Sequence, residues 1–367
     1  AISTIDNNGA NLGQLGNRNM VTNGSMAVTQ RGTSFTAPAS STFTLDRWKY
    51  EESTANVVNV EQSSDAPAGF ERSIKVTTTT AAGSVGSNDF AQLLYKIEGY
   101  DLSRLAYGTS DAKTSTISFW VKSSVTGSFP FGLQNHDGTR VFPVTYTVNS
   151  ANTWEYKTIT IAGDTGGTWT TNNNTTGMRF TFLWISGSNF TGGVDGGGWA
   201  ATTGFANLTS SYTANLDVVN ATFQITGVQL EVGDTATPFE HRSYGEELAK
   251  CQRYYSVIKP VQAHPIWIYT STNWSTTFPH PTTMRVVPSI SFTGTPVNTA
   301  GGSSATNNFS SYSDGAWRGM ATLSASQSAS SVDISRIDGT TNSAVTSGFS
   351  GGFYMGSECS INMDAEL

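Results

Sequence analysis

Hydrophobic residues recur at every second position in many short segments of the chain, and clusters of Gly, Asn, Asp and Ser separate these segments. A period of two is the pattern of a β-strand that buries one face. Ile117, Phe119 and Val121, for example, fall on one side of a strand. Such runs predict strands at residues 57–60, 74–78, 117–121, 141–148, 154–161, 178–185 and 222–232. Short strands at this spacing predict an antiparallel β-sandwich, which we expect to be jelly-roll-like.

The alternation changes phase once, inside the run 222–232. Phe223 and Ile225 share one parity, whereas Val228 and Leu230 share the other, and Gly227 lies between the two pairs. A phase shift at a glycine is what a β-bulge produces. We therefore expect a kinked strand at Gly227.

A helical period replaces the β period convincingly in one place, residues 244–258. Pro260 is expected to end this helix because proline disrupts a helix interior. One stripe of the helix carries residues at positions i, i+3, i+7 and i+10: Leu248, Cys251, Tyr255 and Ile258. The pattern predicts one short helix that links two β regions.

The part of the chain after this helix is again β-like. Residues 299–313 are a low-complexity Ser, Ala, Gly and Asn stretch, for which we expect a loop. The last nine residues alternate strictly, so they predict a C-terminal strand with one buried face. The buried set is expected to be Cys359, Ile361, Met363, Ala365 and Leu367. No internal repeat is visible, which counts against a solenoid, a propeller or a parallel β-helix.

The first residues of the chain are too polar and too rich in glycine to bury much surface by themselves. We expect an arm there that becomes ordered on a partner. Ala1 stands in place of Met, so either an initiator Met is removed or the numbering begins inside a longer product. The predicted fold class is all-β. Its parts are an N-terminal arm (1–17), the sandwich (18–243), the linking helix (244–258) and a smaller C-terminal β-domain (259–367).

Composition narrows the range of partners. Among 367 residues only 13% are charged, and the net charge of -7 argues against nucleic acid, whose phosphates favour a basic surface. No apolar run approaches the roughly 18 residues that a membrane span needs, so we expect no membrane insertion. The abundance of Ser, Thr, Asn and Gly, with 11% aromatic residues, is typical of a secreted or particle-borne β protein that meets neutral polar partners such as sugars. Two cysteines, Cys251 and Cys359, allow one disulfide at most, and we expect two buried thiols instead.

Several motifs together resemble one family. They are "NRNMVTNGSMAVTQRGT" from Asn17, "FTLDRW", "TISFWVKS", "NTWEYKTITIAGDTGGTW", "ITGVQLEVGDTATPFEHRSYGEELAKCQRYYSV" and the terminal "DAEL". In this order they resemble bacteriophage virion appendage proteins, the tail fibre and capsid fibre components with a sandwich like that of carbohydrate-binding modules. The resemblance runs from Asn17 to about Ile258 and is weaker beyond Pro260.

The resemblance implies a non-enzymatic appendage that is often a homotrimer and resides on the virion, at the tail or the capsid surface. The expected partners are further copies of the chain, other virion structural proteins that contact the arm, and host surface polysaccharide. A purely structural capsid decoration or fibre, and a polysaccharide depolymerase, remain open as alternatives.

Catalytic chemistry has little support in the sequence. Hydrolysis of a glycoside needs two carboxylates facing each other across a cleft. Glu155, Glu231 and Glu240 are candidate acids, but nothing in the sequence brings two of them together, and we expect the last two to anchor loops. The four histidines are scattered, without the spacing of a zinc site, and the chain has no nucleophile elbow. We therefore expect no catalytic residues, no metal and no cofactor.

Sugar binding needs an exposed aromatic face together with polar groups that meet hydroxyls. Trp169 and Trp199 lie in glycine-containing loops, Asp195 stands beside Trp199, and Trp274 lies in the C-terminal part. Loops at the edge of a sandwich often carry function, so these four residues are the candidate glycan site. The other tryptophans within strand patterns are assigned to cores: Trp48, Trp120, Trp154 and Trp184. Asp46 and Arg47, which precede Trp48, are interpreted as local anchors.

Overall fold

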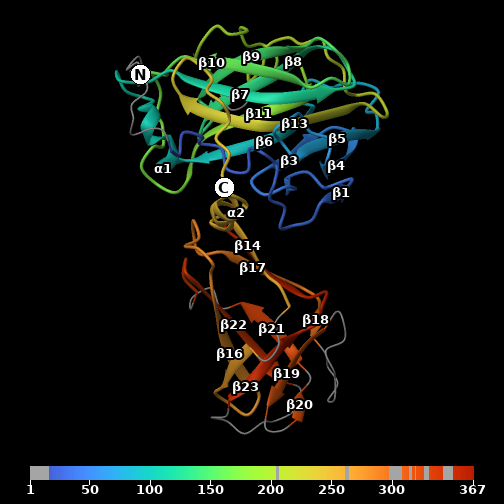
Figure 1. Cartoon of the computed structure of the whole chain (residues 1–367), viewed down its shortest axis with the longest axis vertical. Coiled ribbons are helices and arrows are strands. Elements are labelled where there is room, and N and C mark those ends of the chain that lie inside the picture. The colour runs from blue at the N-terminus through green and yellow to red at the C-terminus, as the bar shows by residue number, and fades with distance from the viewer. Residues whose placement is uncertain are drawn as a thin grey trace, which may run out of the picture. The chain divides into compact units, whose positions relative to one another are not determined.

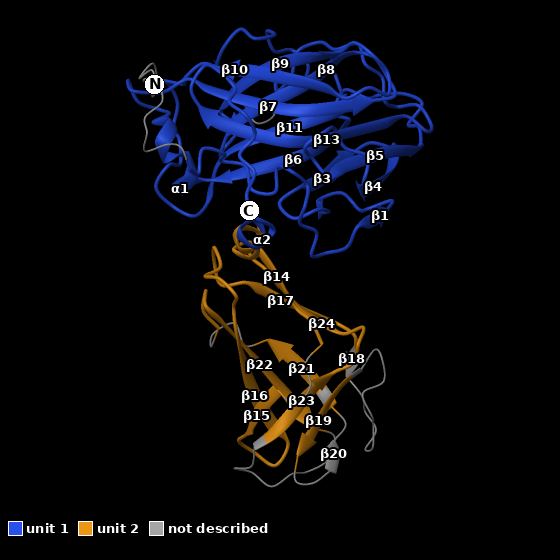
Figure 2. Cartoon of the chain, in the orientation of Figure 1, with its two compact units in different colours: residues 1–247, 367 blue, residues 248–366 orange. Residues whose placement is uncertain are grey.

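The structure is a computed structural model that describes residues 16–203, 206–260, 264–296, 308–313, 316–318, 320–325, 330–341 and 350–367. The chain forms two compact units, one from residues 1–247 with Leu367 and the other from residues 248–366 (Figure 2). All but two residues of the expected arm, 1–17, fall outside the described residues, as does the part 299–307 of the low-complexity stretch.

The first unit is the predicted β-sandwich of antiparallel sheets (Figure 1). One sheet has six strands, in the order β1 (Ser34–Thr36), β4 (Val57–Ser63), β5 (Ser73–Thr80), β13 (Thr222–Val232), β7 (Ser115–Ser123) and β10 (Glu155–Ile161). The other has seven, in the order β12 (Ala200–Ala201), β9 (Arg140–Val148), β8 (Gly127–Asn135), β11 (Thr176–Ser186), β6 (Phe90–Glu98), β3 (Lys49–Ser53) and β2 (Thr42–Phe43).

Alternate side chains of both sheets meet in one apolar core. Phe119 of β7 contacts Phe182 of β11 across this core, and the fully buried Trp48 contacts Phe180 and Phe182. All seven predicted strands of this unit are present. A short helix, α1 (Gly99–Leu102), and a 3-10 turn (Ser103–Leu105) follow β6.

The bulge expected in β13 is confirmed. The pairing of β13 with β7 shifts register between Thr226 and Gln229, and Gly227 between them has a φ of 62°. A φ in this region is costly for residues with a Cβ, so glycine is suited to the position. The shift lets both halves of β13 point apolar side chains into the same core.

The second unit has its own sheets and its own core. β24 (Ser360–Asp364) is the middle strand of a three-stranded sheet, between β14 (Tyr255–Ile258) and β17 (Ser289–Thr293). The larger sheet consists of β18 (Thr295–Pro296), β19 (Asn308–Ser313), β23 (Ser350–Met355), β15 (His264–Ile268), β16 (Asn273–Pro279), β22 (Ile334–Thr341) and β21 (Met320–Ala325), with β20 (Ala316–Arg318) paired to β19. Cys359, Ile361, Met363 and Ala365 are buried, as the C-terminal alternation predicts. Leu367, expected in the same buried set, is only partly buried, and β24 ends at Asp364.

Two predicted boundaries are wrong. The linking helix α2 spans Tyr244–Gln252, and the residues predicted as its last turn form strand β14 instead. Tyr255–Ile258 pair with β24, and this ladder of backbone hydrogen bonds outweighs the helical spacing of the side chains. Residues 308–313, expected in a loop, form β19 because Phe309 and Ser311 pair with β23.

The cysteines and two of the tryptophans lie as expected. Cys251 and Cys359 are buried and neither forms a disulfide. Trp48 and Trp184 are buried in the core of the first unit. Trp120 and Trp154 are only partly buried, so their assignment to a core is wrong.

Candidate functional site

The structure brings two of the predicted site residues together. The rings of Trp169 and Trp199 lie 5.0 Å apart between centroids, at 89°, and Tyr107 contacts both rings. Trp169 is 9% exposed and Trp199 is partly buried. Trp169 therefore offers no open face to a sugar, and the prediction that it does is wrong, whereas Trp199 keeps part of its surface.

Hydrogen bonds explain why these indoles are fixed. The Nε1 of Trp169 donates to Oδ2 of Asp164 at 3.1 Å, and the Nε1 of Trp199 donates to the carbonyl of Ala162 at 2.8 Å. Arg140 donates to both Asp164 oxygens, at 2.8 and 2.6 Å. The hydrogen bond with Asp164 raises the pKa of Arg140. The bidentate ion pair of Arg140 with Asp164 therefore fixes the loop that carries Asp164 and Trp169 to strand β9.

Asp195 and Trp274 take other roles. Asp195 is exposed, and its carboxylate accepts hydrogen bonds from the N–H of Thr145 at 2.6 Å and from the Thr145 hydroxyl at 2.9 Å. It anchors the glycine-rich loop to β9. Trp274 is fully buried in the core of the second unit, so the prediction of an exposed ring there is wrong. It lies on strand β16, where its ring packs closely over Gly339 of the neighbouring strand.

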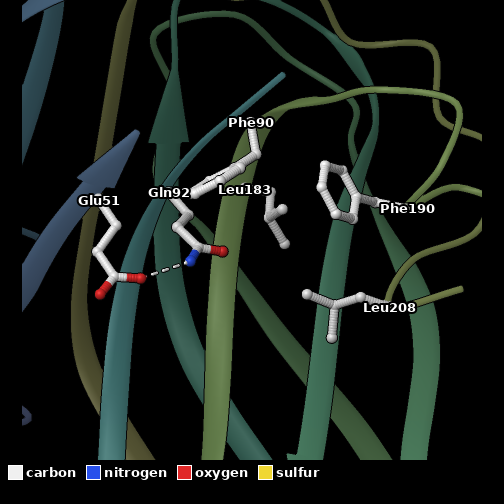
Figure 3. Close-up of a pocket in the computed structure, with 6 residues that line it drawn as sticks. All are labelled: Glu51, Phe90, Gln92, Leu183, Phe190 and Leu208. Atoms are coloured by element: carbon white, nitrogen blue, oxygen red, sulfur yellow. Dashed lines mark hydrogen bonds between the residues drawn. The ribbon is translucent and has the colours of Figure 1, made fainter. Parts of the chain in front are cut away.

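A recess on the outer face of the seven-stranded sheet has the chemistry that the predicted site lacks (Figure 3). In Figure 3, Glu51 and Gln92 form one side of it and Phe190 and Leu208 the other. The recess is lined by Glu51, Phe90, Gln92, Leu183, Phe190 and Leu208.

The sequence builds this recess from two parts. Phe90 and Gln92 of β6 alternate with the core residues Ala91 and Leu93, so they point to the outer face of the sheet. The segment between β11 and β13 lies over that face. A Cβ on Gly132 of β8 would stand 2.5 Å from the carbonyl oxygen of Leu208, so the absence of a side chain there permits the close approach.

The recess combines apolar walls with one polar edge. Phe90 and Phe190 contact each other edge to face at 5.8 Å and are both partly buried. Gln92 donates from Nε2 to Oε2 of Glu51 at 3.1 Å, and Lys49 pairs with Oε1 of Glu51 at 2.7 Å. The recess is open to solvent and has a volume of about 60 Å³. On this measure one water needs about 10–15 Å³, so the recess has room for a substituent or an edge of a sugar.

Sequence reasoning missed this recess because its lining comes from five separate segments. The sequence carries one usable signal, an aromatic residue, Phe190, just before the glycine-rich stretch 192–198.

Each candidate acid is engaged by hydrogen bonds within the fold. Glu231 accepts from the N–H and the hydroxyl of Thr237, and Glu240 accepts from the N–H of Asn19, so both anchor loops as predicted. Burial raises the pKa of Glu155, but hydrogen bonds from Lys157 and from the N–H groups of residues 149 and 150 outweigh burial and lower it to about 2. A general acid needs a raised pKa, so Glu155 is unsuited to that role.

Among the described residues, no group of three or more His, Cys, Asp or Glu side chains is placed to hold a metal ion. No helix among them combines the length and the apolar character needed to cross a bilayer.

No protein-family model matches the chain, and no curated protein matches its sequence. Among solved structures, it is similar to the enzymatically active domain of tailspike protein 4 from Bacteriophage CBA120, at 13% identity and a TM-score of 0.34, over 59% of this chain and 22% of that chain. It is also similar to the CBM22-1 xylan-binding domain of Xyn10C from Paenibacillus barcinonensis, at 10% identity and a TM-score of 0.30, over 59% of this chain and 96% of that chain. TmCBM61 in complex with β-1,4-galactotriose matches at 10% identity and a TM-score of 0.29, over 59% and 99% of the two chains.

Proposed function

We propose that the chain is a non-enzymatic adhesion protein that binds cell-surface glycans. The observation that carries the proposal is the recess beside β6, where two phenylalanine rings face a carboxylate and an amide. Aromatic rings pack on the C–H groups of a sugar, and fixed polar groups accept or donate hydrogen bonds to its hydroxyls. The small volume suits an apolar substituent, such as the methyl of an acetyl group.

We further propose that the protein works as a homotrimeric tail or capsid fibre component of a bacteriophage particle. The ordered motifs between Asn17 and Ile258 support this assignment. In such a particle the arm 1–17 contacts other virion proteins, and the sandwich contacts host polysaccharide. Many copies on one particle multiply a modest affinity through effective concentration.

The test is binding of the full chain to an array of bacterial capsular and O-antigen polysaccharides. Phe190→Ala should weaken binding roughly tenfold, because one aromatic contact contributes ~0.5–1.5 kcal/mol beyond its buried area. Tyr100→Ala is the matched control, since Tyr100 lies on α1, is 57% exposed and does not line the recess. Melting temperature should stay nearly unchanged in both variants.

Three outcomes would contradict parts of this proposal. A parent chain that binds no polysaccharide favours a purely structural fibre. Equal binding by Phe190→Ala and the parent removes the recess as the site. Release of reducing ends from a bound polysaccharide would make the chain a depolymerase.

A further inference from the structure

A row of aromatic side chains crosses the outer face of the six-stranded sheet, on the other sheet from the recess. The rings of Phe239 and His241 lie 4.9 Å apart, and those of His241 and Phe70 lie 5.2 Å apart. Farther along, Trp120 of β7 and Tyr156 of β10 are direct cross-strand partners with rings 5.3 Å apart. None of the five is buried, and Tyr156 is 44% exposed. The row thus consists of two groups of partly open aromatic rings.

The β-bulge joins the two halves of this row. A Cβ on Gly227 would stand 2.6 Å from Cζ of Phe70 and 3.2 Å from Cδ1 of Trp120. The missing side chain therefore lets both rings settle over the backbone of β13. Gly227 therefore has two roles. It shifts the register of β13 so that both halves of the strand face the core, and it leaves room for the aromatic row.

Polar side chains border the row and are held in place. Asp65 accepts hydrogen bonds from Lys122 at 2.7 Å, from the Nε1 of Trp154 at 3.1 Å and from Gln224 at 3.3 Å. The hydrogen bond from Lys122 lowers the pKa of Asp65, so this carboxylate stays ionised at neutral pH. Trp154, which is partly buried, is oriented by its hydrogen bond to Asp65.

A polar pocket of about 330 Å³ lies at the Phe70 end of the row. Its inner wall is the ion pair of Arg242 with the buried Glu247, at 3.4 Å. Its rim carries exposed charged or titratable side chains: Glu71, Arg72 and His241. Small-molecule pockets span roughly 300–1,000 Å³, so this one has room for a single sugar unit.

We infer that the aromatic row and the polar pocket form a second glycan site, which binds an oligosaccharide stretch of a bacterial surface polysaccharide. The pocket holds one sugar unit, whose hydroxyls meet positively and negatively charged side chains at the rim. The rings of Trp120 and Tyr156 pack on the apolar faces of the sugar units that follow. The cores of protein interfaces are depleted in charged residues, so the charged pocket favours a hydroxyl-rich ligand over another protein. The inference rests on the proposed function for its ligand class, but not on the recess.

The test uses the full chain and the same polysaccharide array, with the two sites changed separately. Arg72→Ala and Tyr156→Ala alter exposed side chains of the pocket and the row. Each variant should weaken binding roughly tenfold, as expected for the loss of one aromatic or charged contact, and the double variant should lose more. Tyr100→Ala again serves as the control, and circular dichroism confirms that each variant is folded.

The outcomes separate this inference from the recess. Loss of binding in the Arg72 and Tyr156 variants, with Phe190→Ala unaffected, supports the second site and removes the recess. Loss in all three supports two sites on one chain. If only Phe190→Ala loses binding, the second site is wrong while the proposed function stands. A parent chain that binds none of the polysaccharides overturns both.

Discussion

Single side chains of the sandwich are held by hydrogen bonds that span many residues of sequence. Asp46 accepts from the N–H of Gln30 at 2.6 Å and from its side-chain amide at 2.7 Å. Arg47 donates to the carbonyl of Lys96 at 2.6 Å, and the indole of Trp48 donates to the carbonyl of Asn23 at 3.1 Å. The interpretation of this triplet as two anchors and a core tryptophan is confirmed. Asp46 and Arg47 are buried, so they serve the fold rather than a ligand.

Glu155 makes the stability of the first unit depend on pH. Its pKa is about 2 in the folded chain, below the ordinary value of 4.5, so its contribution is complete above about pH 5 and is lost as the pH falls through 2. Glu155→Gln should lower the free energy of unfolding at pH 7, and the difference from the parent should shrink toward pH 2. Urea denaturation at a series of pH values measures this.

The control for this prediction is Glu61→Gln. Glu61 pairs with Lys75 at 2.9 Å, with both side chains substantially exposed, and such pairs contribute ~0–1 kcal/mol. A Glu155→Gln variant whose deficit is the same at pH 3 and pH 7 would contradict the assigned role.

At the scale of elements, the strands that alternate cleanly were predictable and two central strands were not. β6 carries apolar side chains on both faces, including Leu93 and Leu94, so no period of two is visible. β8 contains Pro130 and Gly132, which normally argue against a central strand. Both strands nevertheless lie inside the seven-stranded sheet, because β6 pairs with β3 and β11, and β8 pairs with β9 and β11.

Two glycines should respond in opposite ways to alanine. Gly227→Ala places a Cβ at a positive φ and against Phe70, and should destabilise the first unit by about 1–2 kcal/mol or more. Gly245→Ala adds a methyl group in open space within α2, and should be neutral or stabilising by up to ~1 kcal/mol. Thermal and urea denaturation measure both. Equal stability of Gly227→Ala and the parent would mean that the bulge does not require glycine.

At the scale of the whole molecule, the two units have separate hydrophobic cores. Trp48 belongs to the core of the first unit and Trp274 to that of the second, and both are fully buried. Separate cores allow separate unfolding, so calorimetry should show two transitions. Trp48→Ala should lower the midpoint temperature of one transition, and Trp274→Ala that of the other. Each substitution should reduce the free energy of unfolding of its own unit by the ~3–5 kcal/mol typical of such a truncation.

These two variants act as controls for each other. A single transition that both substitutions shift together would show that the units unfold as one. Both proposed glycan sites lie within the first unit, so neither result bears on them.

The sequence alone determined the features that depend on local pattern. The period of two gave seven strands and the buried face of the C-terminal residues, and the phase shift at Gly227 gave the bulge, because side-chain parity along a strand is a property of consecutive residues. The helical spacing around Cys251 is likewise a pattern of nearby residues, and it predicted helix α2. Residues 255–258 nevertheless pair with β24, so the helix ends earlier than this spacing predicts.

Only the tertiary structure decided which aromatic residues remain open to solvent. Trp274 is buried and Trp120 is not, although both lie on strands, because burial depends on what covers the other side of a sheet. The recess at Phe190 and the row at Tyr156 each join segments far apart in sequence. No periodicity along the chain encodes contacts of this kind, so the sequence predicted the sandwich but neither of these two surfaces.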